Sequence, residues 1–138
     1  MFLGSFTRIL GVMELFIYLL INGILYISFG VWCALFPEYT SSAVGLLAPT
    51  AQGFTEYVAV YGGLEFGVGM FFVLSVIKPR LRHAGLIFGL CFYSGLALFR
   101  TYAICRVGTD IGAAFNFYLA ELFFAAWSVR LVWKYERK

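Results

Sequence analysis

The sequence has few charged residues and few of the residues that build metal or redox sites. Only 12% of its 138 residues are charged, and there is a single histidine. The three cysteines, Cys33, Cys91 and Cys105, contain no C-x-x-C pair. This set indicates no disulfide framework, thiol redox motif or ordinary zinc or haem site, so we expect no metal and no cofactor. No basic stripe accompanies the formal charge of +3, which argues against nucleic acid as a partner.

Apolar residues fill most of the chain instead, with 62% hydrophobic and 20% aromatic residues. This composition is typical of a membrane protein and excludes an ordinary soluble domain. Crossing a bilayer takes about 20 mostly apolar residues, and four runs reach that length. They cover residues 9–36, 54–77, 84–105 and 113–134. We therefore predict an all-α integral membrane four-helix bundle, a single four-span domain over residues 1–138, in contact with the lipid bilayer.

Basic residues gather at one end of the predicted spans. Those on this side are Arg8, Lys78, Arg80, Arg82, Arg130, Lys134, Arg137 and Lys138. Arg106 is alone on the other side. Because cytoplasmic loops carry an excess of Lys and Arg, both termini are predicted to face the cytoplasm of a bacterial inner membrane. Residues 37–53 would then form an outer interfacial loop, with one or two helical turns after Ser41 or Ser42.

Three ionisable residues, Glu65, Arg100 and Glu121, fall inside the predicted spans. A charge at the bilayer centre costs roughly 2.5 to 3.5 kcal/mol on insertion scales, so each of them needs a partner or a role. Helical periodicity lets all three point inward at compatible depths. Arginine suits such a site, because its planar fork can bond two carboxylates and it keeps its charge when buried. We predict that Arg100 contacts Glu65, Glu121 or both.

The role of this intramembrane polar cluster stays open at the level of the sequence. It could clamp the helices together, or it could handle a proton or a ligand. Glu14 and Arg130 lie near the cytoplasmic ends of their spans, where long side chains reach the interface easily. We interpret these two as plain interfacial anchors.

Other polar side chains share faces with the cluster or with one another. Tyr18, Asn22 and Tyr26 are spaced four apart in the first span and so form one stripe. Tyr93 shares a face with Arg100, and Tyr118 shares one with Glu121. Hydrogen bonding between helices explains such a stripe, and a ligand-facing surface is the alternative.

Small residues indicate where the predicted helices approach closely. The patterns Gly63-x-x-x-Gly67 and Gly85-x-x-x-Gly89 allow close contact between helix backbones. At 100° per residue, Gly62 and Gly69 lie on the face of Glu65, opposite Gly63 and Gly67. Both faces of the second span are therefore expected to be buried, which makes a homo-oligomer or a larger membrane complex plausible.

A family resemblance rests on three runs of sequence. They are YGGLEFGVGMF at 61–71, GLALFR ending at Arg100, and YLAEL around Glu121. Together they resemble a family of small bacterial four-span membrane proteins known only as a domain of unknown function. The resemblance covers most of the chain and implies the four-span architecture, without any activity. Members often carry an Arg just before the paired glycine, where this sequence has Val58, Ala59 and Val60.

Three classes of function are compatible with these observations. The first is a binding or accessory membrane subunit that holds a lipid, an apolar ligand or a partner complex, and we favour it because no nucleophile–base pair, metal cluster or phosphate loop is evident. The alternative is a proton-linked transporter or oligomeric pore that uses Glu65, Arg100 and Glu121. A membrane enzyme with Glu65 or Glu121 as general acid or base has the least support, and we predict no catalytic residue.

Overall fold

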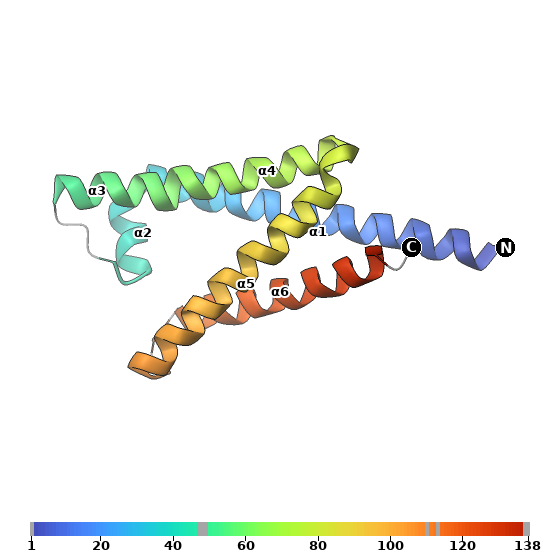
Figure 1. Cartoon of the computed structure of the whole chain (residues 1–138). Helices are drawn as coiled ribbons and strands as arrows, with labels where there is room; N and C mark the ends of the chain where they lie inside the picture. The colour runs from blue at the N-terminus through green and yellow to red at the C-terminus, as the bar shows by residue number, and fades with distance from the viewer. Residues whose placement is uncertain (1, 47–49, 110, 113, 137–138) are drawn as a thin grey trace. The chain divides into compact units, whose positions relative to one another are not determined.

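Every regular element in the described part of this computed structural model is helical. The structure describes residues 2–46, 50–109, 111–112 and 114–136, and the side chains of these residues except 2–10 and 136. Predictions about Arg8, Arg137 and Lys138 lie outside that description. The helices are α1 (Phe2–Leu35), α2 (Pro37–Ala43), α3 (Ala51–Tyr57), α4 (Glu65–Ile77), α5 (Arg82–Val107) and α6 (Ala114–Glu136), as labelled in Figure 1. A π-helical segment, Val58–Leu64, joins α3 to α4, and a 3-10 turn precedes α5.

Four helical segments are long and apolar enough to cross a membrane. They are Gly11–Leu35, Ala51–Ile77, Pro79–Val107 and Ala114–Tyr135. The predictions of an all-α fold and of four apolar segments long enough to span a membrane are thus confirmed, and the chain is a small multi-span membrane protein. The second segment begins earlier than predicted, because the side chain of Thr50 accepts a hydrogen bond from the amide of Gly53 at 3.0 Å and caps α3.

The segment between the first two spans contains a helix that the sequence analysis placed too late. Helix α2 begins at Pro37, whose fixed φ suits the first helical turn. The backbone of Phe36, at φ −130° and ψ 57°, separates it from α1. Ser41 lies inside α2, and its hydroxyl donates to the carbonyl of Glu38 at 3.1 Å. The predicted start after Ser41 or Ser42 is therefore wrong, because Pro37 begins the helix.

The contacts within the chain divide it into two units, which are described separately. One unit comprises residues 1–17 and 80–138, and the other comprises residues 18–79. Helix α1 contributes its first half to the former and its second half to the latter. We call them the terminal unit and the central unit.

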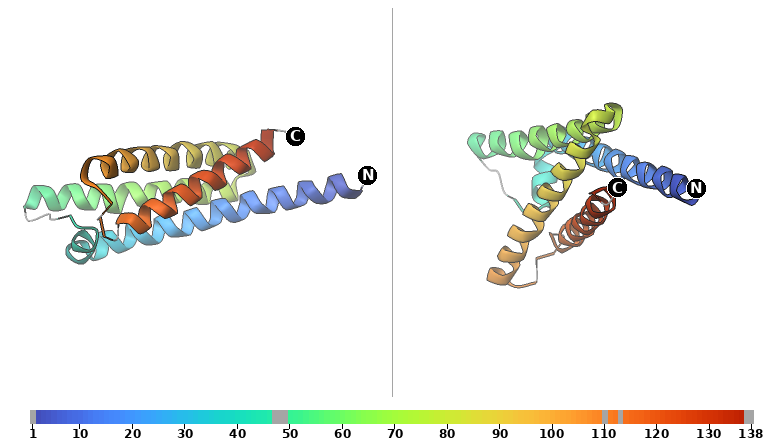
Figure 2. Two further views of the ribbon diagram at one scale, coloured as in Figure 1. Left: turned by 90° about the horizontal axis from the view of Figure 1, so that it is seen from below. Right: turned by 45° about the vertical axis from the view of Figure 1, so that its right-hand side comes forward.

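In the terminal unit, α5 and α6 form an antiparallel hairpin, drawn in yellow to red in Figure 1 and seen from another side in Figure 2. Helix α5 ends at Val107 and is capped by Gly108, whose amide donates to the carbonyl of Ile104 at 2.8 Å. Gly108 has φ +92°, a conformation that only glycine adopts without strain. Aromatic packing joins the two helices, since Tyr93 stacks on Phe124 with ring centroids 5.0 Å apart.

In the central unit, the second half of α1 lies antiparallel to the π-helical segment and α4, as the two views in Figures 1 and 2 agree. Phe72 of α4 is fully buried, and the rings of Tyr18 and Tyr26 both pack against it with centroids 6.3 Å away. The π-helical segment changes the helical phase between α3 and α4. Positions on either side of it therefore do not follow the 100° periodicity of an uninterrupted α-helix.

Candidate functional site

The hairpin of the terminal unit holds a bidentate ion pair between Arg100 of α5 and Glu121 of α6. Nε of Arg100 donates to Oε2 at 2.8 Å, and Nη2 donates to Oε1 at 2.7 Å. The Glu121 side chain is only 9% exposed, whereas that of Arg100 is 30% exposed. Two parallel N–H···O bonds fix both side chains in direction as well as in distance. The pair thus ties neighbouring spans together while neutralising both charges.

A second polar contact joins the same two helices, between Thr101, which follows Arg100 on α5, and Tyr118, which lies three residues before Glu121 on α6. The Thr101 hydroxyl donates to the carbonyl of Ala97 at 2.7 Å and lies 2.9 Å from the Tyr118 hydroxyl. Because Thr101 has one hydroxyl hydrogen, Tyr118 is the donor in the contact between the two side chains. The sequence analysis singled out Tyr118 and missed Thr101, since a lone threonine at the end of an apolar span carries no distinctive pattern.

The third predicted member of the cluster, Glu65, is the first residue of α4 and belongs to the central unit. Its Oε2 atom is buried. The structure therefore joins Arg100 to Glu121, while a contact between Arg100 and Glu65 stays a prediction. The position of Glu65 directly after the π-helical segment is of interest, because π-helical turns are frequent at functional sites.

The predicted polar stripe of α1 lies in the core of the central unit. Tyr18 and Asn22 are fully buried, and Nδ2 of Asn22 donates to the carbonyl of Tyr18 at 2.7 Å. Tyr26 stacks on Phe72. A buried contact outside the predicted set lies near the other end of α1, where the Tyr57 hydroxyl donates to Sγ of Cys33 at 3.6 Å. The stripe thus packs on α4 within the unit.

Glycines of α1 and of the second span produce a close helix contact in the central unit. A Cβ built on Gly30 would lie 2.6 Å from the amide nitrogen of Phe66, and one built on Gly69 would lie 2.5 Å from that of Ile27. Gly23 and Gly62 lie along the same contact, where a Cβ would meet Val73 Cγ2 at 2.7 Å and Ala34 Cβ at 3.2 Å, respectively. At Gly30 and Gly69, where the nearest atoms belong to the backbone, only glycine allows such an approach without moving the backbone.

The glycines at this contact differ from Gly63 and Gly67, the pair with the Gly-x-x-x-Gly pattern that the sequence analysis emphasised in the second span. A Cβ on Gly67 would have no atom within 4 Å among the described residues, and one on Gly63 would meet only a carbonyl oxygen at 4.0 Å. Their role in packing stays a prediction. Across the contact, Gly30 lies against Gly62 and Gly23 against Gly69. Within each helix the two glycines are spaced by seven, which is the signal that could have found Gly23 and Gly30. In the terminal unit, Gly85 and Gly89 are buried on α5.

A cluster that the sequence analysis missed surrounds Glu14 in the terminal unit. Nη1 of Arg130 lies 2.7 Å from Oε1 of Glu14, and Nζ of Lys134 donates to Oε2 at 2.8 Å. The indole of Trp127 donates to Oε1 at 3.3 Å. Sequence reasoning interpreted Glu14 and Arg130 as separate anchors. The available signal was the spacing of Trp127, Arg130 and Lys134, which places them on one face of α6.

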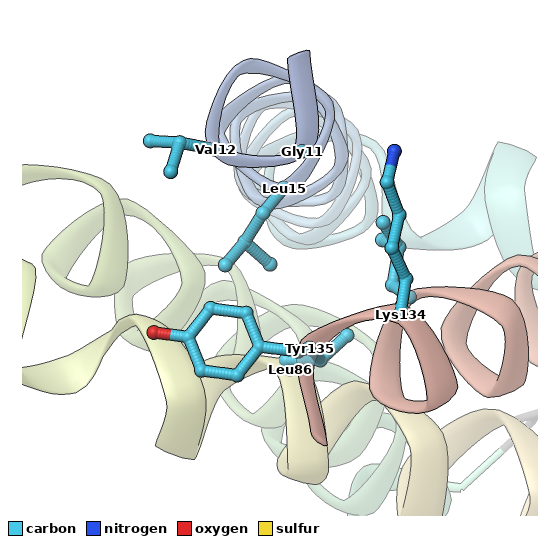
Figure 3. Close-up of a pocket in the computed structure, with 7 residues that line it drawn as sticks. Gly11, Val12, Leu15, Leu86, Lys134 and Tyr135 are labelled. Carbon is cyan, nitrogen blue, oxygen red and sulfur yellow. The ribbon is translucent and has the colours of Figure 1, made fainter. Parts of the chain in front are cut away.

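An apolar hollow lies next to this Glu14 cluster and is shown in Figure 3. Its lining residues are Gly11, Val12, Leu15, Leu86, Leu131, Lys134 and Tyr135. They come from α1, α5 and α6, all within the terminal unit. The hollow is shallow, with a cavity volume of about 20 Å³, and it opens to the surroundings. Lys134 belongs both to the lining of this hollow and to the Glu14 cluster, so the two adjoin at Lys134.

Within the described residues, no group of three or more His, Cys, Asp and Glu side chains could hold a metal ion. Comparison with known proteins identifies one family. The model of a family described as "Domain of unknown function (DUF4345)" matches residues 15–132. No curated protein and no solved structure matches the chain.

Proposed function

Because the chain belongs to the DUF4345 family, a domain of unknown function, we propose its role from the geometry of its own residues. The protein is a small binding or accessory subunit of the bacterial inner membrane. It holds a lipid, another apolar ligand or a larger membrane complex. The apolar hollow beside the Glu14 cluster carries this proposal, because pockets for apolar ligands combine apolar walls with a few polar groups that fix orientation.

Charge neutralisation in the terminal unit supports binding over proton transport. Arg100 and Glu121 form a closed bidentate pair, and Glu14 is neutralised by two cations. The oxygens of both carboxylates are already occupied by arginine or lysine donors, an arrangement that links helices. These groups therefore act mainly as fixed ties between helices that keep the hollow in shape.

The proposed arrangement in the membrane is a single four-helix bundle with both termini in the cytoplasm. Its support is the distribution of basic residues, with three in the segment 78–82 and further ones at Arg130 and Lys134, against Arg106 at the opposite end of α5. The hollow then faces the cytoplasmic leaflet. Gly63 and Gly67 leave room for a second copy or a partner helix against the second span.

Native mass spectrometry of the protein extracted gently from its own membrane tests the binding role. We expect a stoichiometric lipid, small ligand or protein partner to be retained with the chain. The matched variant Gly11→Leu, which places a large side chain in the hollow, should reduce retention of a small ligand. Release of the bare chain under conditions that preserve other membrane complexes would contradict the proposal.

A second candidate function is proton-linked transport, and the placement of Glu65 favours it. This carboxyl group has a buried oxygen, lies inside a span and directly follows the π-helical segment. In liposomes, a transporter would couple proton uptake to a solute, and Glu65→Gln would abolish that coupling. Glu56→Gln is the matched control, because Glu56 is exposed on α3. Equal proton flux in empty liposomes and in those that contain the protein would exclude this function.

A further inference from the structure

We propose that the hollow and the adjoining Glu14 cluster form a binding site for one anionic phospholipid. The lipid phosphate lies against Arg130 and Lys134, and the first methylene groups of an acyl chain lie along the shallow hollow. This inference rests on the proposed binding role and adds to it the chemical class of the ligand and the residues that hold it.

The charges of the Glu14 cluster are not balanced, and the surplus positive charge matches the single negative charge of a lipid phosphodiester. One carboxylate, Glu14, faces two cations, Arg130 and Lys134, at 2.7 and 2.8 Å. One positive charge is therefore left over. The Arg130 side chain is 64% exposed and that of Lys134 is 34% exposed, so both can reach a further anion. A phosphodiester carries one negative charge and is a preferred partner of arginine.

The walls of the hollow require an amphiphile and not a simple anion. Val12, Leu15, Leu86 and Leu131 supply apolar side chains, while Lys134 lies at the point where the hollow meets the charged cluster. Figure 3 shows Lys134 pointing toward α1. A soluble phosphate compound would contact only the charged part of the site. A neutral apolar ligand would fill the hollow and leave the extra positive charge unneutralised.

Aromatic side chains place the site at the depth of the lipid headgroups. Trp127 donates its indole N–H to Glu14, and the ring of Tyr135 stacks on that of His83 with centroids 5.4 Å apart. Trp and Tyr are enriched where hydrocarbon meets the headgroup layer, because their rings are amphipathic. An anionic phospholipid has its phosphate at this level and its chains directly below it.

Lipid titration into the purified full chain, read out by native mass spectrometry, tests the proposal. We expect phosphatidylglycerol to bind with one-to-one stoichiometry and more tightly than phosphatidylcholine. Each cation near an anionic lipid surface contributes roughly a factor of five in affinity. Arg130→Gln should therefore weaken phosphatidylglycerol about fivefold and leave phosphatidylcholine unchanged. Arg106→Gln removes the same charge from the opposite end of α5 and should change neither lipid.

Two further measurements keep the proposal open to contradiction. Gly11→Leu should reduce phosphatidylglycerol binding by filling the hollow, without any change in charge. Soluble glycerol 3-phosphate should compete weakly, because it has no acyl chain. Equal binding of both phospholipids would overturn the proposal of an anionic phospholipid site. Full competition by glycerol 3-phosphate would overturn it as well. Neither result would contradict the proposed binding role. If neither lipid, other ligand nor partner is retained, both proposals fail.

Discussion

Arg100 and Glu121 are joined by two parallel hydrogen bonds of 2.8 and 2.7 Å, although 21 positions separate them in the chain. Each residue alone would be an ionised group inside an apolar span, and together they form a neutral, directional link between α5 and α6. Their pairing makes the stability of the hairpin depend on both residues at once.

Removal of Arg100 should be the most damaging single change at this pair. In Arg100→Ala, the largely buried Glu121 loses its bidentate partner, which we expect to cost about 3 kcal/mol of unfolding free energy. Glu121→Gln should cost less, because the amide still accepts a hydrogen bond from Arg100 and no bare carboxylate remains. Denaturation in a mild detergent measures both. The double variant Arg100→Ala with Glu121→Gln should cost less than the sum of the two single changes, and strictly additive costs would show that the two residues are not coupled.

The glycine contact of the central unit predicts opposite effects at neighbouring glycines. Gly69→Ala should destabilise the protein by about 1 to 3 kcal/mol, because its Cβ would lie 2.5 Å from the backbone of Ile27. Gly67→Ala should be neutral or slightly stabilising, since a Cβ there would have no described atom within 4 Å and alanine favours the helix. Thermal unfolding of the two variants provides the comparison. A larger loss at Gly67 would point to a partner helix on that face.

The hydrogen bond from Tyr118 to Thr101 should make a small, measurable contribution. Tyr118→Phe removes only the hydroxyl and should cost about 0.6 kcal/mol, the average for such bonds between membrane helices. Tyr102→Phe is the matched control, because Tyr102 is 63% exposed on the same helix as Thr101. Chemical denaturation of both variants decides the point. Indistinguishable curves for the two would place the Tyr118 hydroxyl outside the stabilising contacts.

The turn between α5 and α6 should depend on the backbone freedom of Gly108. Gly108→Ala forces a Cβ into a conformation at φ +92° and should cost about 1 to 3 kcal/mol. Gly95→Ala, inside α5 with no described atom within 4 Å of its Cβ, should not destabilise the protein. Thermal unfolding provides the readout. Equal stability of these two alanine variants would show that the turn can adopt another conformation at little cost.

The proposed orientation can be checked by labelling of single cysteines. In a background with the exposed Cys91 and Cys105 replaced by alanine, a cysteine at Arg80 should react only with reagent supplied from the cytoplasm. A cysteine at Ser42, which is exposed on α2, should react only from the outside. The reverse labelling pattern would mean that the basic segment 78–82 lies on the outer side of the membrane, opposite to the cytoplasm.

The sequence alone predicted the spans and one side-chain pair well. Hydropathy sufficed for the spans, since an uninterrupted apolar run of that length satisfies its own backbone in a bilayer core as an α-helix. Arg100 and Glu121 lie on the uninterrupted helices α5 and α6, where a period of 3.6 residues gives the direction of each side chain. Their mutual approach then followed from depth and charge.

The glycine contact and the Glu14 cluster were not predictable in the same way. The π-helical segment shifts the phase of the second span, so faces counted from α3 do not continue into α4. The only local mark of Gly23 and Gly30 in α1 is their spacing by seven, which does not say which helix they meet. Glu14 meets α6 across more than a hundred positions of sequence, and depth alone does not say which helices are neighbours.

The ion pair of Arg100 and Glu121 also bears on how the protein enters the membrane. The two residues belong to consecutive spans joined by a short turn, so they can meet as soon as the second of these spans leaves the ribosome. Insertion of the first span alone would expose an uncompensated guanidinium to lipid, at roughly 2.5 to 3.5 kcal/mol if it lay near the bilayer centre. Insertion of α5 and α6 together, as a helical hairpin in which Arg100 and Glu121 are already paired, therefore has a lower free-energy cost than insertion of α5 alone.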